Sequence, residues 1–360
     1  MGDCNKEVNA MKGYVLNGIN DFSLKDIDIP RVRENEVLVK VRAAGICGSD
    51  IPRIYTTGAH RHPIVLGHEF AGEVCDCDYG TKEAKAWAGK RVGVFPLIPC
   101  RECNPCLNKR YEMCRNYNYL GSRCDGGFAE YVAVPVDNLI ELPDSVTFEQ
   151  AAMLEPMAVA VHAMRGFEID KDDSVVICGL GTIGLMLIMF LKDLGVKNIL
   201  AIGNKDFQYK KALEFGITEE NFCDSRKVSP DKWINDRTKG QGVDIFFECV
   251  GKNETFSLGV DSLAPLGKLM LVGNPYSDMG LSKDIYWKIL RNQLTVKGTW
   301  NSSFTGDEND DWHYVLNRIS SGDMGVDRLI SHRFSMEDFG KGFLIMRDKT
   351  EDYIKIMGEF

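Results

Sequence analysis

Four cysteines are gathered in one short stretch of the chain. They stand at Cys100, Cys103, Cys106 and Cys114, with two, two and seven residues between them. Four thiolates in so short a segment can form a tetrahedral shell around one zinc ion. An iron–sulfur run has a different final spacing, with a proline after its last cysteine. The N-terminus does not resemble a signal peptide, which argues against disulfides. The spacing therefore predicts a structural zinc site.

A second set of residues combines a cysteine, a histidine and carboxylates. Cys47 begins a Cys-Gly-Ser-Asp segment, His68 and Glu69 are adjacent, and Glu155 precedes Pro156. Such ligands suit a catalytic zinc that keeps one position open for water or substrate. Neighbouring side chains of an extended chain point in opposite directions, so His68 and Glu69 need a bend to share the metal. Glu155 is the alternative third ligand, directly or through water.

A glycine-rich segment of the form G-x-G-x-x-G follows the apolar run at 175–178 and opens a predicted helix. The glycines allow a tight turn and a close approach of the backbone to a ligand, and the helix N-terminus then faces a pyrophosphate. This context predicts a dinucleotide site. Its predicted contacts are Gly179, Gly181, Thr182, Ile183 and Gly184.

The end of the next apolar run bears on which dinucleotide binds. An NAD site is expected to have a carboxylate there for the ribose hydroxyls. This chain has Gly203, Asn204 and Lys205 instead. Glycine leaves room for a 2′-phosphate, and the next two residues supply donors and a positive charge. The sequence predicts NADP(H) in preference to NAD(H). The alternative is that Asp206 serves NAD.

Two different patterns of apolar residues indicate the elements that must position these groups. Before about residue 150, alternating segments such as 37–42 and 89–94 are punctuated by glycine and proline, which is typical of an antiparallel β domain. A helix is expected over 151–165. Continuously apolar runs at 175–178, 199–202, 244–250 and 267–273 then predict a parallel, doubly wound sheet. The segment after 301 is expected to rejoin the first domain.

Length and charge exclude several classes of function. A chain of 360 residues is long enough for two domains. It contains no apolar run of membrane-spanning length. The formal net charge of −9 argues against nucleic acid or an anionic membrane as a partner. Residues 1–10 are polar and are interpreted as an N-terminal extension, not a targeting peptide. A cytoplasmic location is expected.

The motifs together resemble the zinc-dependent medium-chain dehydrogenase/reductase family. The resemblance covers the chain after Met11. Segments 49–70 and 119–131 are most similar to the galactitol-1-phosphate dehydrogenases within the polyol group. The motifs that carry the resemblance are GICGSD, GHEFAGE, the four-cysteine segment, DGGFAEY, the EP of 155–156 and GLGTIG.

The resemblance implies a GroES-like catalytic domain over 11–156 and 301–360, with a structural zinc lobe at 95–120. It implies a Rossmann domain over 157–300, with the active site in the cleft between the two. It assigns Cys47, His68 and Glu155, with Glu69 as ligand or partner, to catalytic zinc, and the four clustered cysteines to a second zinc. It makes Ser49 the residue that orients the substrate hydroxyl and passes on its proton. A homodimer or homotetramer is implied.

Two departures from the family pattern bear on the substrate. Many relatives have histidine where this chain has Pro52, so one arm of the proton relay is missing. Sorbitol enzymes are expected to have arginine where this chain has Asn301. The expected reaction is hydride transfer between NADP(H) or NAD and a secondary alcohol or ketone. The favoured substrate is a polyol phosphate such as galactitol 1-phosphate. The alternatives are another secondary alcohol of the sorbitol, threonine or hydroxysteroid type, or a non-catalytic nucleotide-binding protein.

A phosphorylated substrate would need cations near the metal. The candidates are Arg53, His60, Arg61, His62 and Arg123. Each alone is more typical of a solvated surface charge. His162, His313 and His332 are expected to be structural.

Overall fold

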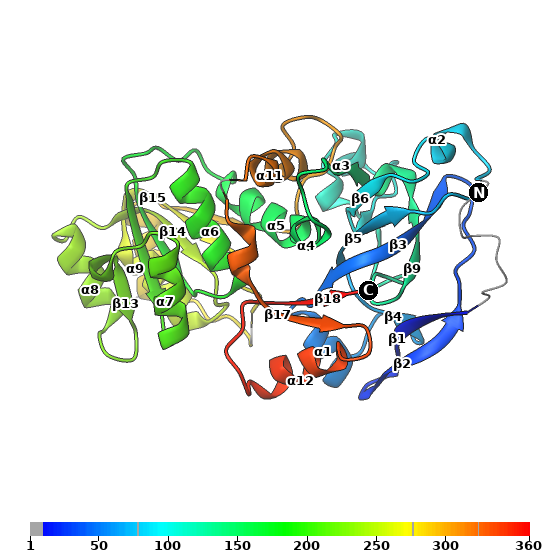
Figure 1. Ribbon diagram of the computed structural model, residues 1–360. Helices are drawn as coiled ribbons and strands as arrows, with labels where there is room; N and C mark the ends of the chain where they lie inside the picture. Colours follow the sequence, from blue (N-terminus) through cyan, green and yellow to red (C-terminus); the bar gives the residue numbers. More distant parts are fainter. Residues whose placement is uncertain (1–9, 78, 276, 323) are drawn as a thin grey trace. The chain divides into compact units, whose positions relative to one another are not determined.

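A computed structural model of the chain describes residues 10–77, 79–275, 277–322 and 324–360 (Figure 1). The chain forms two compact units. Unit 1 comprises Met1–Pro156 and Ser303–Phe360, and unit 2 comprises Met157–Ser302. Of the predicted N-terminal extension, residues 1–9 lie outside the described residues, and Ala10 is the first residue of strand β1. The C-terminal segment thus belongs to the same unit as the first 156 residues.

Unit 1 is built on mainly antiparallel sheets. One has the order β2-β1-β4, a larger one has the order β10-β6-β5-β3-β18-β17 with β9 also paired to β3, and β7 pairs with β8. Among the described pairs of this unit, only β17 and β18 run parallel. The strands are β1 Ala10–Gly18, β2 Asp21–Asp28, β3 Glu36–Gly45, β4 Ile64–Val65, β5 Glu69–Val74, β6 Arg91–Val94, β7 Leu97–Ile98, β8 Asn118–Tyr119, β9 Tyr131–Pro135, β10 Leu139–Glu141, β17 Ile330–Ser335 and β18 Lys355–Glu359.

Short helices surround these sheets, and aromatic side chains from both ends of the chain fill the core. Phe128, Phe339 and Phe343 are fully buried and meet edge to face at 5.2–5.4 Å between ring centroids. Tyr14 joins them and its hydroxyl donates to the Met336 carbonyl at 2.9 Å. The helices of unit 1 are α1 Asp50–Tyr55, α2 Lys82–Lys85, α3 Asn104–Leu107, α4 Phe148–Ala152, α11 Asp311–Ser320 and α12 Gly340–Asp348. Helix α5, Leu154–Met164, begins in unit 1 and continues into unit 2, which starts at Met157.

The helix expected over 151–165 is in fact two helices that break at Met153. Pro156 lies in the first turn of α5 and has no N–H. In a continuous helix its ring would meet the carbonyl of Ala152, four residues earlier. The chain therefore ends α4 and starts α5, which places Glu155 in the first turn of the new helix.

Unit 2 is an α/β layer structure around one parallel sheet. Its order is β13-β12-β11-β14-β15-β16, and each neighbouring pair is parallel. The strands are β11 Ser174–Cys178, β12 Asn198–Gly203, β13 Phe222–Asp224, β14 Val243–Glu248, β15 Leu263–Leu271 and β16 Thr295–Gly298. The helices are α6 Thr182–Asp193, α7 Asp206–Glu214, α8 Pro230–Thr238, α9 Asn253–Ser262 and α10 Lys283–Arg291.

The strand order reverses at β11, from which the chain first moves toward β13 and later toward β16. Right-handed crossovers then put α6 and α7 on one face of the sheet and α8, α9 and α10 on the other. The contacts agree, since α6 meets α7 while α9 meets both α8 and α10. The predicted fold class is confirmed: a mainly antiparallel β unit accompanies a doubly wound parallel sheet.

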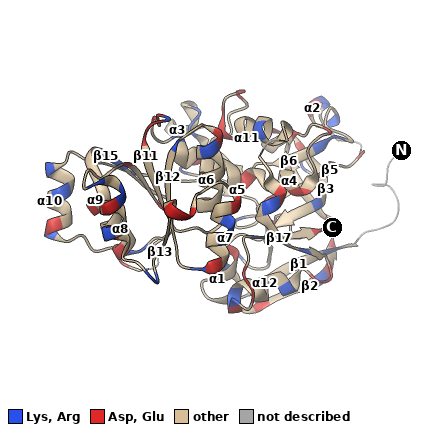
Figure 2. Cartoon of the chain, turned by 60° about the vertical axis from the view of Figure 1, so that its left-hand side comes forward, with Lys and Arg blue, Asp and Glu red and all other residues tan. Residues whose placement is uncertain are grey.

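Charged residues of both signs are spread over the chain. Figure 2 shows Lys and Arg interspersed with Asp and Glu along the ribbon. Among the described residues, no helix is long and apolar enough to cross a membrane.

Candidate active site and zinc centres

The four clustered thiols of unit 1 lie within bonding distance of one common point. They come from a loop that contains α3 and a 3₁₀ turn at Tyr111–Met113. The Sγ–Sγ distances are 3.5 Å for Cys103–Cys106 and Cys114–Cys100, 3.9 Å for Cys103–Cys114 and 4.0 Å for Cys100–Cys106. A tetrahedral zinc with Zn–S bonds of about 2.3 Å requires sulfurs ~3.8 Å apart. The thiols are therefore spaced as zinc ligands.

The backbone of this lobe also favours thiolates. The pKa of Cys103 is lowered to about 6 by hydrogen bonds from the backbone N–H groups of Arg115 and Cys106. The backbone N–H of Cys100 donates to Cys114 Sγ at 3.2 Å. Burial raises the pKa of Cys106 to about 12, so its thiolate form requires a nearby cation to stabilise the negative charge.

A second ligand group forms where β3 ends and β5 begins. Ligand atoms of Cys47, His68 and Glu69 all lie within 4.8 Å of one another. Cys47 follows β3, while His68 stands between Gly67 and the first residue of β5. Gly67 has φ +98°, and a Cβ there would come within 2.4 Å of the Phe128 ring. Only glycine fits this turn, which brings two consecutive polar side chains to Cys47.

Asp50 and Ser49 hold this group from the start of α1. Asp50 is fully buried; it accepts from the Cys47 backbone N–H at 3.1 Å and lies 3.6 Å from His68 Nδ1. A carboxylate behind Nδ1 is the arrangement that turns Nε2 toward a metal. The Ser49 hydroxyl donates to Cys47 Sγ at 3.2 Å and accepts from Arg53 Nη1 at 2.8 Å. Ser49 is therefore next to the candidate ligands, as expected from the sequence.

Glu155 is placed differently from Glu69. Glu155 is buried, and its Oε1 accepts a hydrogen bond from the Tyr119 hydroxyl at 3.2 Å. It does not belong to the ligand group as far as the described residues go. Burial raises the pKa of Glu155 to about 7, with His68 opposing and Glu69 adding to the shift. The arrangement favours Glu69 as the carboxylate ligand beside Cys47 and His68. Glu155 is a second buried carboxylate whose charge interacts with both His68 and Glu69.

Lys355 is a residue of this site that sequence reasoning missed. It is 3% exposed, forms an ion pair with Glu69 Oε2 and donates to the Ile46 carbonyl at 3.2 Å. Burial lowers its pKa, but the charges of Glu69 and Cys47 outweigh this and the pKa is raised. One signal could have found it: a lysine opening the last apolar strand of the chain.

The charges of the site are out of balance without a further cation. Burial, with the charges of Glu69 and Asp50, raises the pKa of Cys47 to about 12. Lys355 pairs with Glu69 and Arg53 pairs with Asp50, so neither cation is left to compensate an ionised Cys47. A divalent cation at Cys47 would reverse this effect and stabilise the thiolate. The donor set of sulfur, imidazole and carboxylate fits zinc.

In unit 2, the glycine-rich segment joins β11 to α6. Gly179 has φ +98°, and a Cβ on Gly184 would lie 2.0 Å from the Gly179 carbonyl oxygen. The turn and the close approach of helix to strand therefore both require glycine. Gly181 caps α6, whose first two residues are Thr182 and Ile183. The arrangement leaves a helix N-terminus at the end of a central parallel strand, as a dinucleotide site needs.

The residues predicted to choose the cofactor lie at the neighbouring strand end. Gly203 is the last residue of β12, and Asn204 and Lys205 lead into α7. The Asn204 backbone N–H already donates to Gln208 Oε1 at 2.9 Å, so this donor is engaged.

Comparison with known proteins agrees with this geometry. Residues 33–144 match a family model described as the alcohol dehydrogenase GroES-like domain, and residues 182–321 match one described as zinc-binding dehydrogenase. Over 314 residues, the chain is 34% identical to galactitol 1-phosphate 5-dehydrogenase of Escherichia coli K12, covering 87% of this chain and 90% of the relative.

The chain belongs to the zinc-dependent medium-chain dehydrogenase family.

Two further relatives show the breadth of this family. L-threonine 3-dehydrogenase of Escherichia coli K12 is 30% identical, covering 90% of this chain and 92% of the relative. The crystal structure of a zinc-binding dehydrogenase of Sinorhizobium meliloti 1021, bound to NADP, has a TM-score of 0.88 at 26% identity. It covers 98% of this chain and 99% of that one. The chain is thus an alcohol or polyol dehydrogenase, and the non-catalytic alternative is set aside.

The cations proposed for a substrate phosphate are not equivalent in the dehydrogenase. Arg61 pairs with Asp125 at 2.7 Å, and His62 Nε2 accepts from the Ala59 backbone at 3.3 Å. Arg123 lies over the Tyr117 ring at 4.5 Å and has no carboxylate partner among the described residues.

The remaining pair, Arg53 and His60, lies near Arg123. Burial and then the charges of Arg123 and Arg53 lower the pKa of His60, which favours its neutral form. Arg53 is tied to Asp50 at 3.1 Å and to Ser49. Arg123 is therefore the arginine of the group that has no carboxylate partner among the described residues.

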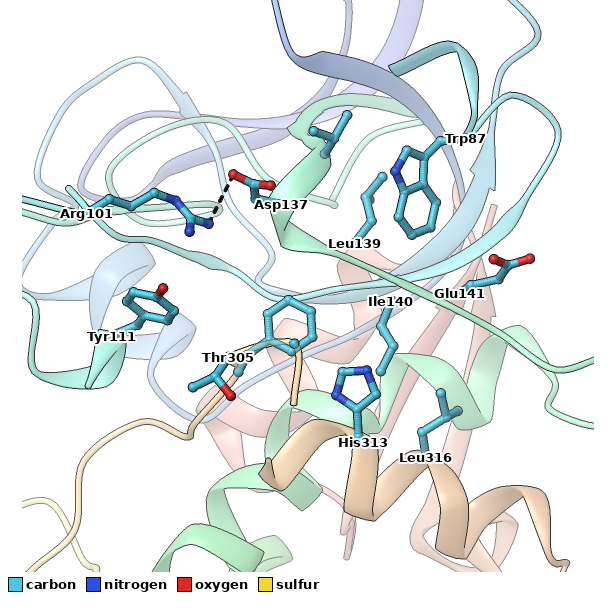
Figure 3. A pocket seen from close by; sticks show the side chains of 13 residues that line it. Trp87, Arg101, Tyr111, Asp137, Leu139, Ile140, Glu141, Thr305, His313 and Leu316 are labelled. Carbon is cyan, nitrogen blue, oxygen red and sulfur yellow. Dashed lines mark ion pairs between the residues drawn. The ribbon is translucent and has the colours of Figure 1, made fainter. Parts of the chain in front are cut away.

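A cavity of about 420 Å³ lies elsewhere in unit 1 (Figure 3). It is lined by Trp87, Tyr111, Phe304 and the ion pair of Arg101 with Asp137, among others. None of its lining residues is a predicted site residue. His313 points into it, and its Nδ1 lies 2.8 Å from Asp310 Oδ1.

His332 lies outside this cavity. Its Nε2 is 3.2 Å from Glu351 Oε2.

Proposed function

We propose that the chain is an NADP(H)-dependent polyol-phosphate dehydrogenase with two zinc ions. Catalytic zinc is held by Cys47, His68 and Glu69, with Glu155 as an exchangeable or water-linked carboxylate, and structural zinc by the four clustered cysteines. Unit 1 is the catalytic domain and unit 2 the nucleotide-binding domain. The observation that carries the proposal is the grouping of Cys47, His68 and Glu69 within 4.8 Å beside the Ser49 hydroxyl.

Zinc at this group would act as a Lewis acid and stabilise the negative charge that develops on the substrate oxygen. The chain's own residues orient the alcohol and handle its proton. The Ser49 hydroxyl can bind the substrate oxygen and accept its proton as it passes its own onward. Arg53 is permanently protonated and Pro52 has no titratable group, so neither can take that proton. The proton that leaves the Ser49 hydroxyl is therefore passed to water.

Two features support the phosphorylated substrate. The relative that is 34% identical over 314 residues is a galactitol 1-phosphate 5-dehydrogenase. Arg123 is a half-buried cation without a carboxylate partner among the described residues, on the loop that carries Tyr119. Tyr119 bonds Glu155 and lies 5.8 Å from the His68 ring, so Arg123 comes from a loop that reaches the metal group. The L-threonine relative favours a second candidate, an amino-alcohol acid.

We predict that Arg123→Ala lowers kcat/KM for galactitol 1-phosphate by ~10- to 100-fold and that for its dephosphorylated analogue by less than about threefold, because a charge-assisted bond to phosphate is lost. The test is a panel of hexitol phosphates, free polyols, threonine and simple secondary alcohols, each with both nicotinamide cofactors. Arg61→Ala is the matched control, since Arg61 is paired with Asp125. Arg53→Ala is less informative, because Arg53 also binds Ser49. Activity confined to unphosphorylated alcohols would refute the phosphate proposal.

We also propose that the enzyme is a homodimer, or a homotetramer made of two such dimers, joined through the edge of the unit 2 sheet. β16 pairs only with β15 on the described part of the chain, and all four of its residues are exposed. Next to it in sequence, α10 exposes Tyr286, Trp287 and Leu290. An open strand edge with exposed apolar side chains is a template for pairing with a second copy.

Val296→Lys, in the middle of β16, is predicted to convert the dimer to monomer at micromolar concentration, because it puts like charges opposite each other across the edge. Light scattering after size-exclusion chromatography measures the mass. Leu344→Lys is the matched control, since Leu344 is also an exposed apolar residue but lies on α12 of unit 1. A monomeric wild type, or an unchanged mass for Val296→Lys, would contradict the proposal.

A further inference from the structure

A cluster of five charged residues lies at the carboxyl ends of β12 and β13. Gly203 and Asp224 end these strands and are register partners. Ser225 ties the two ends together, because its N–H and its hydroxyl both donate to the Gly203 carbonyl, at 2.9 and 3.2 Å. The chain that follows β13 is therefore fixed beside Gly203. An NAD site is expected to have a carboxylate side chain at this strand end to bind the ribose hydroxyls.

Arg226 is held at this point by two carboxylates. Its Nε and Nη2 donate to the two oxygens of Asp224 at 2.8 and 2.7 Å, and Nη2 also meets Asp206 Oδ1. Hydrogen bonds from Arg226 and its neighbours lower the pKa of Asp224, so this anchor stays ionised. Nη1 has no hydrogen-bond partner among the described residues, and the side chain is 44% exposed. The guanidinium is thus fixed on one edge and free on the other.

The same contact engages Asp206, the carboxylate that could otherwise serve NAD. The hydrogen bond and charge of Arg226 lower the pKa of Asp206. An acid at position 203 itself is disfavoured, because a Cβ there would lie 3.0 Å from Gln208 Oε1 and 3.1 Å from Phe222 Cζ. No carboxylate at this strand end is left uncompensated, whereas the cations Lys205, Arg226 and Lys227 outnumber Asp206 and Asp224.

We infer that Arg226, positioned by Asp224, binds the 2′-phosphate monoester of NADP(H) through Nη1 and so sets the cofactor preference. The inference rests on the proposed NADP(H) dependence and adds to Gly203, Asn204 and Lys205 a residue from the next strand. Arginine suits this role because its planar fork can hold a carboxylate on one edge and a phosphate oxygen on the other. The carboxylates of Asp206 and Asp224 oppose the phosphate, and their bonds to Arg226 reduce that opposition.

Arg226→Ala and Arg226→Gln are expected to lower kcat/KM for NADPH by ~10- to 100-fold. This is the loss expected when one charge-assisted hydrogen bond to a phosphate is removed. kcat/KM for NADH should hold or rise, because Asp206 is released to accept from a ribose hydroxyl. Binding of adenosine 2′,5′-bisphosphate should weaken by the same factor, and binding of 5′-AMP by less than about twofold. Lys227→Ala is the matched control, since Lys227 also pairs with Asp224 but is 72% exposed.

The outcomes separate this inference from the proposal on which it rests. A wild type that prefers NADH, or binds the bisphosphate no better than 5′-AMP, overturns both. A wild type that prefers NADPH, with Arg226→Ala retaining that preference, overturns the role of Arg226 alone. Equal losses with NADPH and NADH in both variants indicate a purely structural role and also overturn it.

Discussion

Cys47→Ala is expected to lower dehydrogenase activity by about a thousandfold or more and to remove one of two zinc ions per chain. The thiolate is the only sulfur ligand in the group with His68 and Glu69. Without it, the site keeps too few donors for tight binding. Lewis-acid stabilisation of the reacting oxygen is worth several kcal/mol, and each ~1.4 kcal/mol is tenfold in rate. Turnover with the best substrate of the panel, and metal content by mass spectrometry, measure the two effects.

The remaining zinc reports on the second centre. In Cys47→Ala the four-cysteine lobe is intact, so one zinc should stay and NADPH should bind as in the wild type. Cys75→Ala is the matched control, because Cys75 is a free thiol of the same unit outside both ligand groups. Full activity, or two zinc ions retained by Cys47→Ala, would show that the reactive metal is held elsewhere.

The parts of the site that sequence could predict are those encoded locally. The cysteine spacing places four thiols in one loop, and the glycine-rich segment lies between a buried strand and a helix, so neither needs knowledge of the tertiary fold. The apolar runs of unit 2 predicted its parallel sheet for the same reason: strands buried on both faces carry their burial in their composition.

The residues that were missed reach the site through long-range pairing. Lys355 meets Glu69 because β18 pairs with β3, aligning Met357 with Gly45, more than 300 positions away in sequence. Arg226 meets Asp206 only because β12 and β13 are neighbours in register. The choice between Glu69 and Glu155 also depended on the turn at Gly67. Strand register is a property of the folded chain, so a local pattern can single out Lys355 as a lysine in an apolar strand but cannot reveal which residue it meets.

The ion pair of Lys355 with Glu69 is the second contact whose removal should have a large effect. Lys355→Met leaves Glu69, which is 1% exposed, without its cation. Breaking a buried pair on one side typically costs ~3–5 kcal/mol. We expect the free energy of unfolding of metal-free unit 1 to fall by about that much, measured by denaturant unfolding at pH 7. The raised pKa of Lys355 means that the pair is fully formed below its ordinary value of 10.5 and is lost only at higher pH.

Zinc and a second substitution distinguish charge from packing as the cause. Bound zinc lies beside Glu69 and should recover part of the loss, because it supplies the missing positive charge. Glu69→Gln in the Lys355→Met background should also recover part of it, because the carboxylate that lost its cation is then removed. Lys12→Met is the matched control: its pair with Glu337 is exposed on both sides, so solvent screens it and its loss should change the stability little. If Lys355→Met is as stable as wild type, or if Glu69→Gln adds to the loss, then Lys355 does not compensate the Glu69 charge and the site needs no buried lysine to hold its carboxylate in place.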